Sequence, residues 1–207
     1  MPGPLHPATC TIIIRMETPE FKTVGIVGAG AMGRGIAQIA AQAGSKVLLF
    51  DTQADAVAKA RESVAAQWDK LVEKGRIDAA AATAQKERLQ PAATLADLAP
   101  CDLIVEAIVE RLDVKKGLFA ELEGIVQPTA VLATNTSSLS VTAIAAGLKR
   151  PQQFAGFHFF NPVPLMKVVE CIAGLKTDPA VCQRLATYAL QMGHTPVQAE
   201  DTPGFIV

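Results

Sequence analysis

A glycine-rich turn is the first feature of the sequence that could do chemistry. Gly28, Gly30 and Gly33 form a G-x-G-x-x-G pattern directly after the apolar run 23–27 and at the start of an amphipathic stretch. Glycines at these offsets permit a tight turn and let the backbone approach a pyrophosphate, while the helix that follows supplies N–H groups and a positive dipole end. The pattern therefore predicts a dinucleotide site between the first strand and the first helix.

Asp51 follows the second apolar run, 47–50, about 20 residues after the turn. A carboxylate there can accept from both hydroxyls of a ribose and would repel a 2′-phosphate. We therefore expect NAD rather than NADP as cofactor. The alternative is that Asp51, with Thr52, only caps the next helix.

Three polar groups follow or interrupt later apolar runs, and they indicate carbonyl chemistry. Glu170 lies inside the apolar run 168–172, where an unpaired charge would be costly, and His158 ends the run before it. We expect a pair in which the carboxylate fixes the imidazole tautomer and raises its basicity, so that it can remove a hydroxyl proton during hydride transfer. Ser137, in the polar segment 135–139, could hold the same oxygen. Alternatively, that segment is only a helix cap and His158 a satisfied core residue.

Short apolar runs alternate with alanine-rich amphipathic stretches, which predicts an α/β fold of the Rossmann type, doubly wound on a mostly parallel sheet. We expect strands over 23–27, 47–50, 103–105, 130–133, 154–158, 166–172 and 195–198. Helices are expected over 31–43, 54–74, 78–88, 114–126 and 178–192. The pair 54–74 and 78–88 is longer than a plain crossover, so it is interpreted as a helical hairpin inserted after the second strand.

Composition limits the class of protein. The 207 residues carry a formal net charge of −1 and are 50% hydrophobic, which argues against a nucleic-acid partner and against disorder. No apolar stretch approaches the roughly 18 residues of a membrane span. Cys10, Cys101, Cys171 and Cys182 form no C-x-x-C pair, so we expect reduced, mostly buried cysteines, no metal site and a cytoplasmic location. Residues 1–20 are interpreted as an extension, either a tag or an upstream start, and residues 21–207 as the NAD-binding catalytic domain.

Five motifs together resemble the NAD-binding domain of the 3-hydroxyacyl-CoA dehydrogenases, over about residues 22–207. They are VGAGAMG at 27–33, EAIVE at 106–110, NTSSL at 135–139, HFFNP at 158–162 and DTPGF at 201–205. The histidine and serine motifs make the resemblance specific. The alanine-rich style is similar to that of bacterial members acting on 3-hydroxybutyryl-CoA or 3-hydroxyadipyl-CoA.

The resemblance implies NAD-dependent oxidation of an L-3-hydroxyacyl-CoA to the 3-oxoacyl-CoA, in fatty-acid β-oxidation or related acyl-CoA degradation. His158 would be the general base, Glu170 its orienting partner, and Ser137 a contact to substrate and cofactor. The hairpin would hold the CoA moiety, with Lys74 as a phosphate contact, although Gln67 stands where the family can carry a serine. The remaining cofactor contacts implied by the motifs are Ala31 and Met32 at the glycine turn, Asp51 at the adenosine ribose, and Glu110, Lys115 and Asn161 at the nicotinamide ribose.

The family also continues beyond the Pro-Gly-Phe segment with a catalytic asparagine and a helical domain that closes the cleft and forms a homodimer. We expect that domain to be absent from this chain, and the chain alone to lack turnover. Two alternatives stay open: an NAD-binding module without turnover, and a different β-hydroxyacid dehydrogenase.

Overall fold

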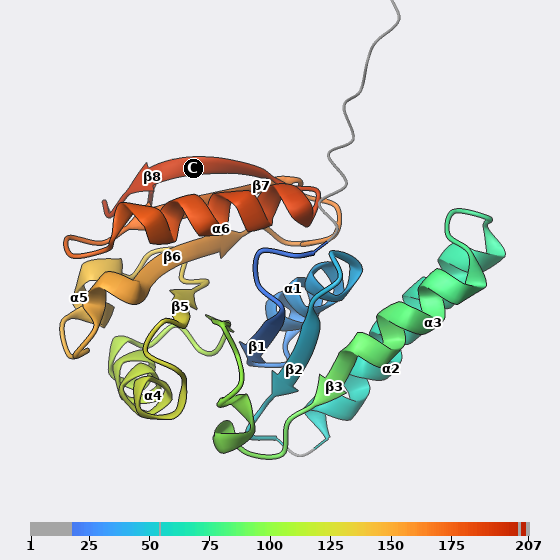
Figure 1. Cartoon of the computed structure of the whole chain (residues 1–207), viewed down its shortest axis with the longest axis horizontal. Coiled ribbons are helices and arrows are strands. Elements are labelled where there is room, and N and C mark those ends of the chain that lie inside the picture. The colour runs from blue at the N-terminus through green and yellow to red at the C-terminus, as the bar shows by residue number, and fades with distance from the viewer. Residues whose placement is uncertain (1–17, 54, 203, 206–207) are drawn as a thin grey trace, which may run out of the picture.

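An eight-stranded sheet runs through the part of the chain that the computed structural model describes, residues 18–53, 55–202 and 204–205 (Figure 1). The strand order is β3-β2-β1-β4-β5-β6-β7-β8, and neighbouring strands are parallel except β6 and β7, which are antiparallel. The strands are β1 (Thr23–Val27), β2 (Lys46–Phe50), β3 (Leu89–Pro91), β4 (Leu103–Glu106), β5 (Val131–Thr134), β6 (Phe154–Phe159), β7 (Val168–Ala173) and β8 (Thr195–Glu200). The expected doubly wound, mostly parallel fold is confirmed.

Helices cover both faces of the sheet because side chains along each strand alternate between two apolar clusters. Val24 and Ile26 of β1 join the cluster on the face of α1 (Ala31–Gln42) and α6 (Pro179–Gln191), whereas Val27 joins the cluster on the other face. The second face is covered by α4 (Leu112–Ile125) and α5 (Val141–Ala145). The central strands are therefore buried on both sides, as their continuous apolar runs predict.

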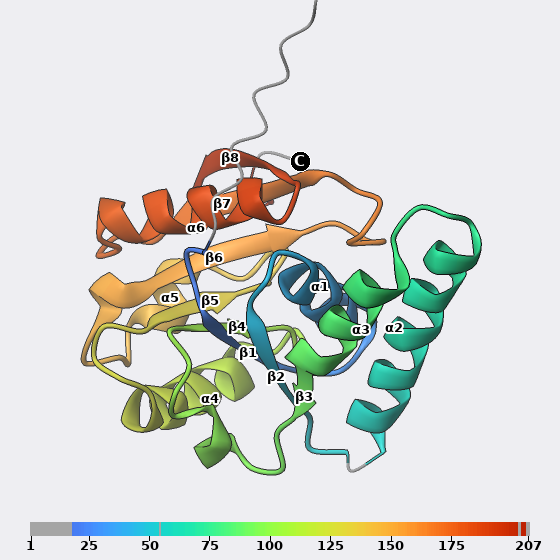
Figure 2. The same cartoon turned by 45° about the vertical axis from the view of Figure 1, so that its right-hand side comes forward.

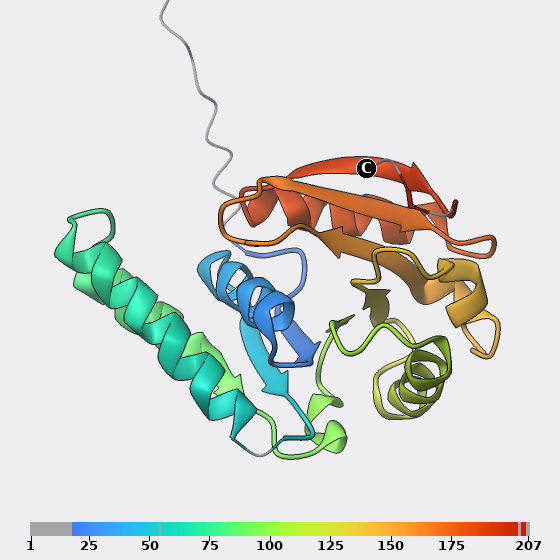
Figure 3. The same cartoon turned by 180° about the vertical axis from the view of Figure 1, so that it is seen from behind.

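The inserted hairpin consists of α2 (Ala56–Glu73) and α3 (Ala79–Arg88), and it stands away from the sheet beside α1 (Figures 2 and 3). Trp68 of α2 is fully buried in the cluster that includes α1. The turn between the helices begins at Lys74 and Gly75, where Gly75 has a φ of +64° that favours glycine. The hairpin prediction is confirmed.

Four short elements were not predicted, since none is long enough to show a period: β3, α5 and the 3₁₀ helices Leu95–Leu98 and Pro151–Gln153. Strand β3 extends the sheet beyond β2 and carries Pro91 at the sheet edge, where a missing N–H is tolerated. Helix α5 begins after Ser140, whose side chain accepts from the N–H of Ala143. Strand β7 starts two residues later than expected, and β8 ends two residues later.

The described residues of the expected extension, 18–20, contact α6. The Arg184 Nε donates to Glu20 Oε1 at 2.7 Å. Cys101, Cys171 and Cys182 are free and buried, as expected, and burial raises the pKa of Cys101 and of Cys171 to about 12. Residues 1–17, which include Cys10, and the last two residues lie outside the described residues. None of the described helices combines the length and apolar character needed to cross a membrane.

Candidate active site

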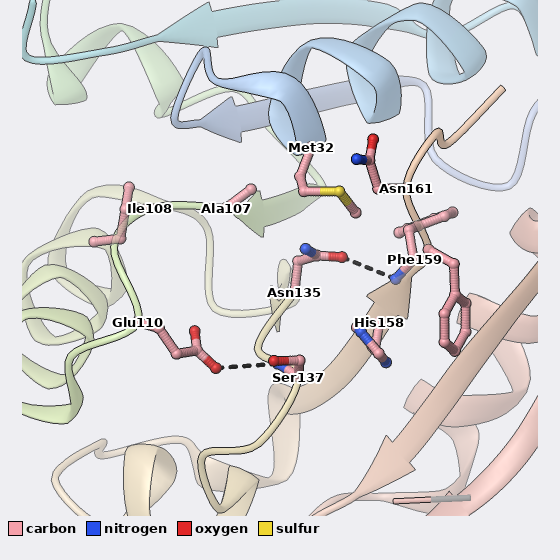
Figure 4. A pocket seen from close by; sticks show the side chains of 10 residues that line it. Met32, Ala107, Ile108, Glu110, Asn135, Ser137, His158, Phe159 and Asn161 are labelled. Atoms are coloured by element: carbon pink, nitrogen blue, oxygen red, sulfur yellow. Dashed lines mark hydrogen bonds between the residues drawn. The ribbon is translucent and has the colours of Figure 1, made fainter. Parts of the chain in front are cut away.

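A cavity of about 340 Å³ lies where the carboxyl ends of β1, β4, β5 and β6 meet (Figure 4). This edge is where open α/β sheets bind ligands. The lining residues come from the start of α1, from the segments that follow β4 and β5, and from the end of β6 with the segment after it: Met32, Ala107, Ile108, Glu110, Asn135, Ser137, His158, Phe159, Phe160 and Asn161. Six residues expected from the sequence to form the site, namely Met32, Glu110, Ser137, His158, Asn161 and, through His158, Glu170, are thus brought together.

His158 and Glu170 form the expected pair. They are register partners on the antiparallel strands β6 and β7, and the His158 Nδ1 lies 2.7 Å from Glu170 Oε2. The Glu170 side chain is 1% exposed and the His158 side chain 13% exposed. An ionised carboxylate only accepts hydrogen bonds, so Nδ1 carries the proton of the neutral ring and Nε2 is left as the basic nitrogen at the cavity.

The segment after β5 is held in place from both sides. Asn135 Oδ1 accepts from the backbone N–H of Phe159 at 2.8 Å, and Glu110 Oε1 accepts from the N–H of Ser137 at 3.0 Å (Figure 4). Ser137 is exposed and lines the same cavity as His158. Ser137 and His158 therefore border one cavity from the ends of neighbouring strands.

The space around the glycine turn shows whether a dinucleotide fits there. A Cβ on Gly28 would meet Ala107 O at 2.5 Å, and a Cβ on Gly33 would meet Gly28 O at 1.8 Å, so internal packing requires both glycines. A Cβ on Gly30 would meet no atom within 4 Å, and Gly30 has an ordinary φ of −66°. The space in front of Gly30, at the N-terminus of α1, fits a pyrophosphate at this position.

Asp51 follows β2 and contacts the turn. Its Oδ2 accepts from the N–H of Ala29 at 2.7 Å and its Oδ1 from the N–H of Gln53 at 2.9 Å. The N-cap of α2 is Asp55, so the alternative that Asp51 caps this helix is wrong. Arg61 and Asp51 also line one cavity of about 470 Å³, a relation that sequence spacing did not indicate.

Lys115 lies buried behind the wall of the cavity, and its expected role at the nicotinamide ribose stays a prediction. It is 1% exposed, and its Nζ lies 2.6 Å from Glu106 Oε1 and 3.2 Å from Glu110 Oε2. The lining of the cavity includes Glu110 but neither Lys115 nor Glu106. Partial burial raises the pKa of Glu110, but hydrogen bonds from Thr136, Lys115 and Ser137 and the charge of Lys115 outweigh this effect and lower it. Glu110 is therefore an anion at the cavity wall, and the buried Lys115 forms an ion pair with it on the side away from the cavity.

The residues expected to hold CoA are divided between two places. A second cavity of about 220 Å³ shares Asn161 with the first and is lined by Ala31, Arg34 and Gln67 among others. Lys74 is exposed at the turn of the hairpin and lines none of the cavities described above. Gln67 thus lies at a cavity beside the site, and the expected contact of Lys74 with CoA stays a prediction.

Two residues of the site were missed. Asn135 was part of a quoted motif but was given no role, and its bond to Phe159 shows how it joins β5 to β6. Glu106 was also in a motif without a role. Its signal was the same as that of Glu170, a carboxylate in an otherwise apolar strand, and it is fully buried.

Most of the chain is similar to proteins of one known family. Residues 23–202 match the family model described as 3-hydroxyacyl-CoA dehydrogenase, NAD binding domain. The chain is 45% identical over 188 residues to a 3-hydroxyadipyl-CoA dehydrogenase of Escherichia coli K12, covering 91% of this chain and 40% of that protein. It is 41% identical over 187 residues to a 3-hydroxybutyryl-CoA dehydrogenase of Bradyrhizobium diazoefficiens, covering 90% and 64%.

Solved structures are similar over the same span. A crystal structure of 3-hydroxybutyryl-CoA dehydrogenase from E. coli K12 matches with a TM-score of 0.88 at 45% identity, covering 90% of this chain and 39% of that one. A crystal structure of (S)-3-hydroxybutyryl-CoA dehydrogenase from Ralstonia eutropha matches with a TM-score of 0.87 at 38% identity, covering 90% and 66%. The chain therefore spans less than two thirds of the first curated relatives that it matches.

Proposed function

Because this chain belongs to the 3-hydroxyacyl-CoA dehydrogenase family through its NAD-binding domain, we propose that it supplies cofactor binding and proton transfer for the oxidation of an L-3-hydroxyacyl-CoA to the 3-oxoacyl-CoA. The observation that carries this proposal is the His158–Glu170 pair at 2.7 Å, beside a cavity that reaches the start of α1. Hydride removal from a secondary alcohol needs a base for the hydroxyl proton, and this pair supplies one.

In this proposal His158 Nε2 takes the proton from the substrate hydroxyl, while Glu170 holds Nδ1–H and stabilises the imidazolium that forms. The Ser137 hydroxyl donates to the same substrate oxygen. Bound NAD would supply the hydride acceptor. The N–H groups at the start of α1 would hold the pyrophosphate, and Asp51, which accepts from the turn in this structure, would also accept from the adenosine ribose.

Binding of the reduced cofactor tests the first step. Titration of the 207-residue chain with NADH, followed by fluorescence, should show saturable binding, and NADPH should bind far more weakly. Asp51→Asn should narrow that difference because it removes the charge that repels a 2′-phosphate. Equal affinity of the unmodified chain for NADH and NADPH would contradict the role of Asp51, and Arg61 would then be the first residue to test as a phosphate contact.

We also propose that turnover requires a second, helical region of the enzyme that completes the acyl-CoA site and forms a homodimer, and that the enzyme works in the cytoplasm. The support for a second region is the length of the relatives, of which this chain spans 40% and 64%. Its helical nature, the homodimer and the location are what the family resemblance and the reduced cysteines imply. An assay of acetoacetyl-CoA-dependent NADH oxidation on this chain is the test. Little or no turnover together with intact NADH binding is expected, and appreciable turnover would show that this span is sufficient.

A further inference from the structure

Three ionisable side chains form a chain of contacts from the end of β4 to the wall of the cavity. Glu106 Oε1 accepts from Lys115 Nζ at 2.6 Å and from the N–H of Ile108 at 2.7 Å, and its Oε2 accepts from Thr134 Oγ1 at 2.7 Å. Lys115 Nζ lies 3.2 Å from Glu110 Oε2. We call Glu106, Lys115 and Glu110 the acidic triad.

The acidic triad carries one uncompensated negative charge. It contains two carboxylates and one ammonium group, and Glu106 and Lys115 are 0% and 1% exposed, so water screens little of the field between them. Glu110 is the exposed end, with 38% of its side chain accessible. It also accepts from Thr136 Oγ1 and from the N–H of Ser137, which fix its carboxylate at the cavity.

The negative charge of Glu110 lies where it would affect the binding of an oxidised and of a reduced nicotinamide differently. The following inference rests on the proposed function: a nicotinamide that exchanges hydride with a carbon held at His158 must lie in the cavity that both His158 and Glu110 line. The oxidised ring is a cation and the reduced ring is neutral. A fixed negative charge at the wall stabilises only the oxidised form.

We propose that the acidic triad sets the preference of this site for oxidised over reduced nicotinamide cofactor, and that Glu106 is a positioning residue which acts through Lys115. Without Glu106, the lysine would neutralise Glu110, and the wall of the cavity would lose its charge. With Glu106, most of the lysine charge is already balanced, so Glu110 keeps its own. A direct contact of Lys115 with the cofactor would have a different signature, because its loss would weaken both oxidation states.

The experiment measures the dissociation constants of NAD⁺ and NADH separately, by calorimetry on the 207-residue chain at one ionic strength. Glu110→Gln and Glu106→Gln each remove one negative charge from the acidic triad. Each should raise the ratio of the NAD⁺ to the NADH dissociation constant by about fivefold, the size expected for a unit charge acting over several ångströms in a partly screened interior. Glu110→Asp keeps the charge and should leave the ratio near that of the unmodified chain even where both affinities fall.

Asp113→Asn is the matched control. It removes one negative charge from the first turn of α4, three residues after Glu110, but Asp113 is 68% exposed beside Arg111, so the ratio should not change. Urea midpoints confirm that each variant folds, and Glu110→Gln decides the question if Glu106→Gln does not fold. An unchanged ratio in Glu110→Gln would overturn the inference. Failure of the unmodified chain to bind either cofactor would instead overturn the proposed function.

Discussion

Two strands on opposite flanks of the cavity carry a buried carboxylate, and the two carboxylates have different partners. On β7, Glu170 contacts the imidazole of His158, whereas on β4, Glu106 contacts the ammonium group of Lys115. Each carboxylate is nearly inaccessible, and each supports a group that reaches the cavity, His158 directly and Glu110 through the lysine. An imidazole changes its charge near neutral pH and an ammonium group does not. The β7 flank is therefore suited to proton exchange and the β4 flank to a constant field.

The largest effect expected on the β7 flank is that of His158→Gln. The variant removes the base, so turnover of an acyl-CoA substrate by the full-length enzyme should fall about 10³-fold. NADH affinity of the 207-residue chain should stay within about twofold, because proton transfer takes no part in cofactor binding. Steady-state kinetics and fluorescence titration measure the two quantities.

His194→Gln is the control for that variant. His194 is also buried, but its Nδ1 and Nε2 face backbone carbonyls of Met192 and Val163 at 3.1 Å and 3.0 Å, and it does not line the cavity. His194→Gln should lower the free energy of unfolding and leave the turnover rate largely unchanged. A comparable loss of rate in both variants would mean that His158 has only a structural role.

On the β4 flank the largest effect should be on stability. Lys115→Met leaves Glu106 buried without its cation, which should lower the free energy of unfolding by about 3 kcal/mol. Adding Glu106→Gln should recover part of that loss, because the unpaired charge is then gone. Urea denaturation of the single and double variants tests this, and strictly additive losses would show that the two side chains are not coupled.

The contrast between the flanks also explains how much the sequence could predict. The pair of His158 and Glu170 was predictable because a carboxylate inside an apolar strand needs a partner and a histidine ends the strand before it. Glu106 gave the same local signal, but its partner lies nine residues later on a helix. Only the packing of α4 against β4 and β5 brings Lys115 to it. The contact between Glu106 and Lys115 was therefore not predictable from residue spacing, and the role of Lys115 at the ribose, which the resemblance implies, stays a prediction.

The helices and strands also divide into those that the sequence predicts and those that depend on tertiary contacts. Long periodic elements were predicted nearly to their ends, since burial of an apolar face dictates them. Strand β3 and helix α5 were missed because three and five residues show no period, and their formation depends on edge pairing with β2 and on caps from Ser140 and Asp201. The fold could thus be predicted from local sequence patterns, whereas the contact between Glu106 and Lys115 behind the cavity wall depends on tertiary packing.

Glu170→Gln tests whether the negative charge of Glu170, and not only its hydrogen bond to His158, contributes to turnover. The amide can still hold Nδ1–H, but it does not stabilise the imidazolium, so turnover should fall by about tenfold to thirtyfold. The acid limb of the rate profile should move to lower pH, because a neutral neighbour favours the unprotonated ring. A rate loss with an unchanged pH profile would indicate that Glu170 only packs against the histidine.

Asp201 extends the comparison to a carboxylate held by neither an imidazole nor an ammonium group. Its Oδ1 accepts from the N–H of Val141, and its Oδ2 from Thr142 N–H and Ser140 Oγ, at the start of the helix that follows the Ser137 segment. Burial raises the pKa of Asp201, but these hydrogen bonds outweigh it and lower the pKa below its ordinary 3.8.

Asp201→Asn should therefore lower the free energy of unfolding at pH 7 by about 1 kcal/mol, the smallest of these effects. A carboxyl whose pKa is lowered on folding stabilises the protein above its unfolded pKa and stops doing so as the pH falls through the folded value. The difference between the unmodified chain and the variant should accordingly shrink as the pH is lowered from 3.8. Asp78→Asn, at the N-cap of the exposed helix α3, is the control, since asparagine caps a helix as well as aspartate does. If the difference in the free energy of unfolding between the unmodified chain and Asp201→Asn stays the same in acid, the shape of the Asp201 side chain, and not its charge, holds this segment. Asp201 would then differ from the carboxylates of the β4 flank, whose charge is expected to matter.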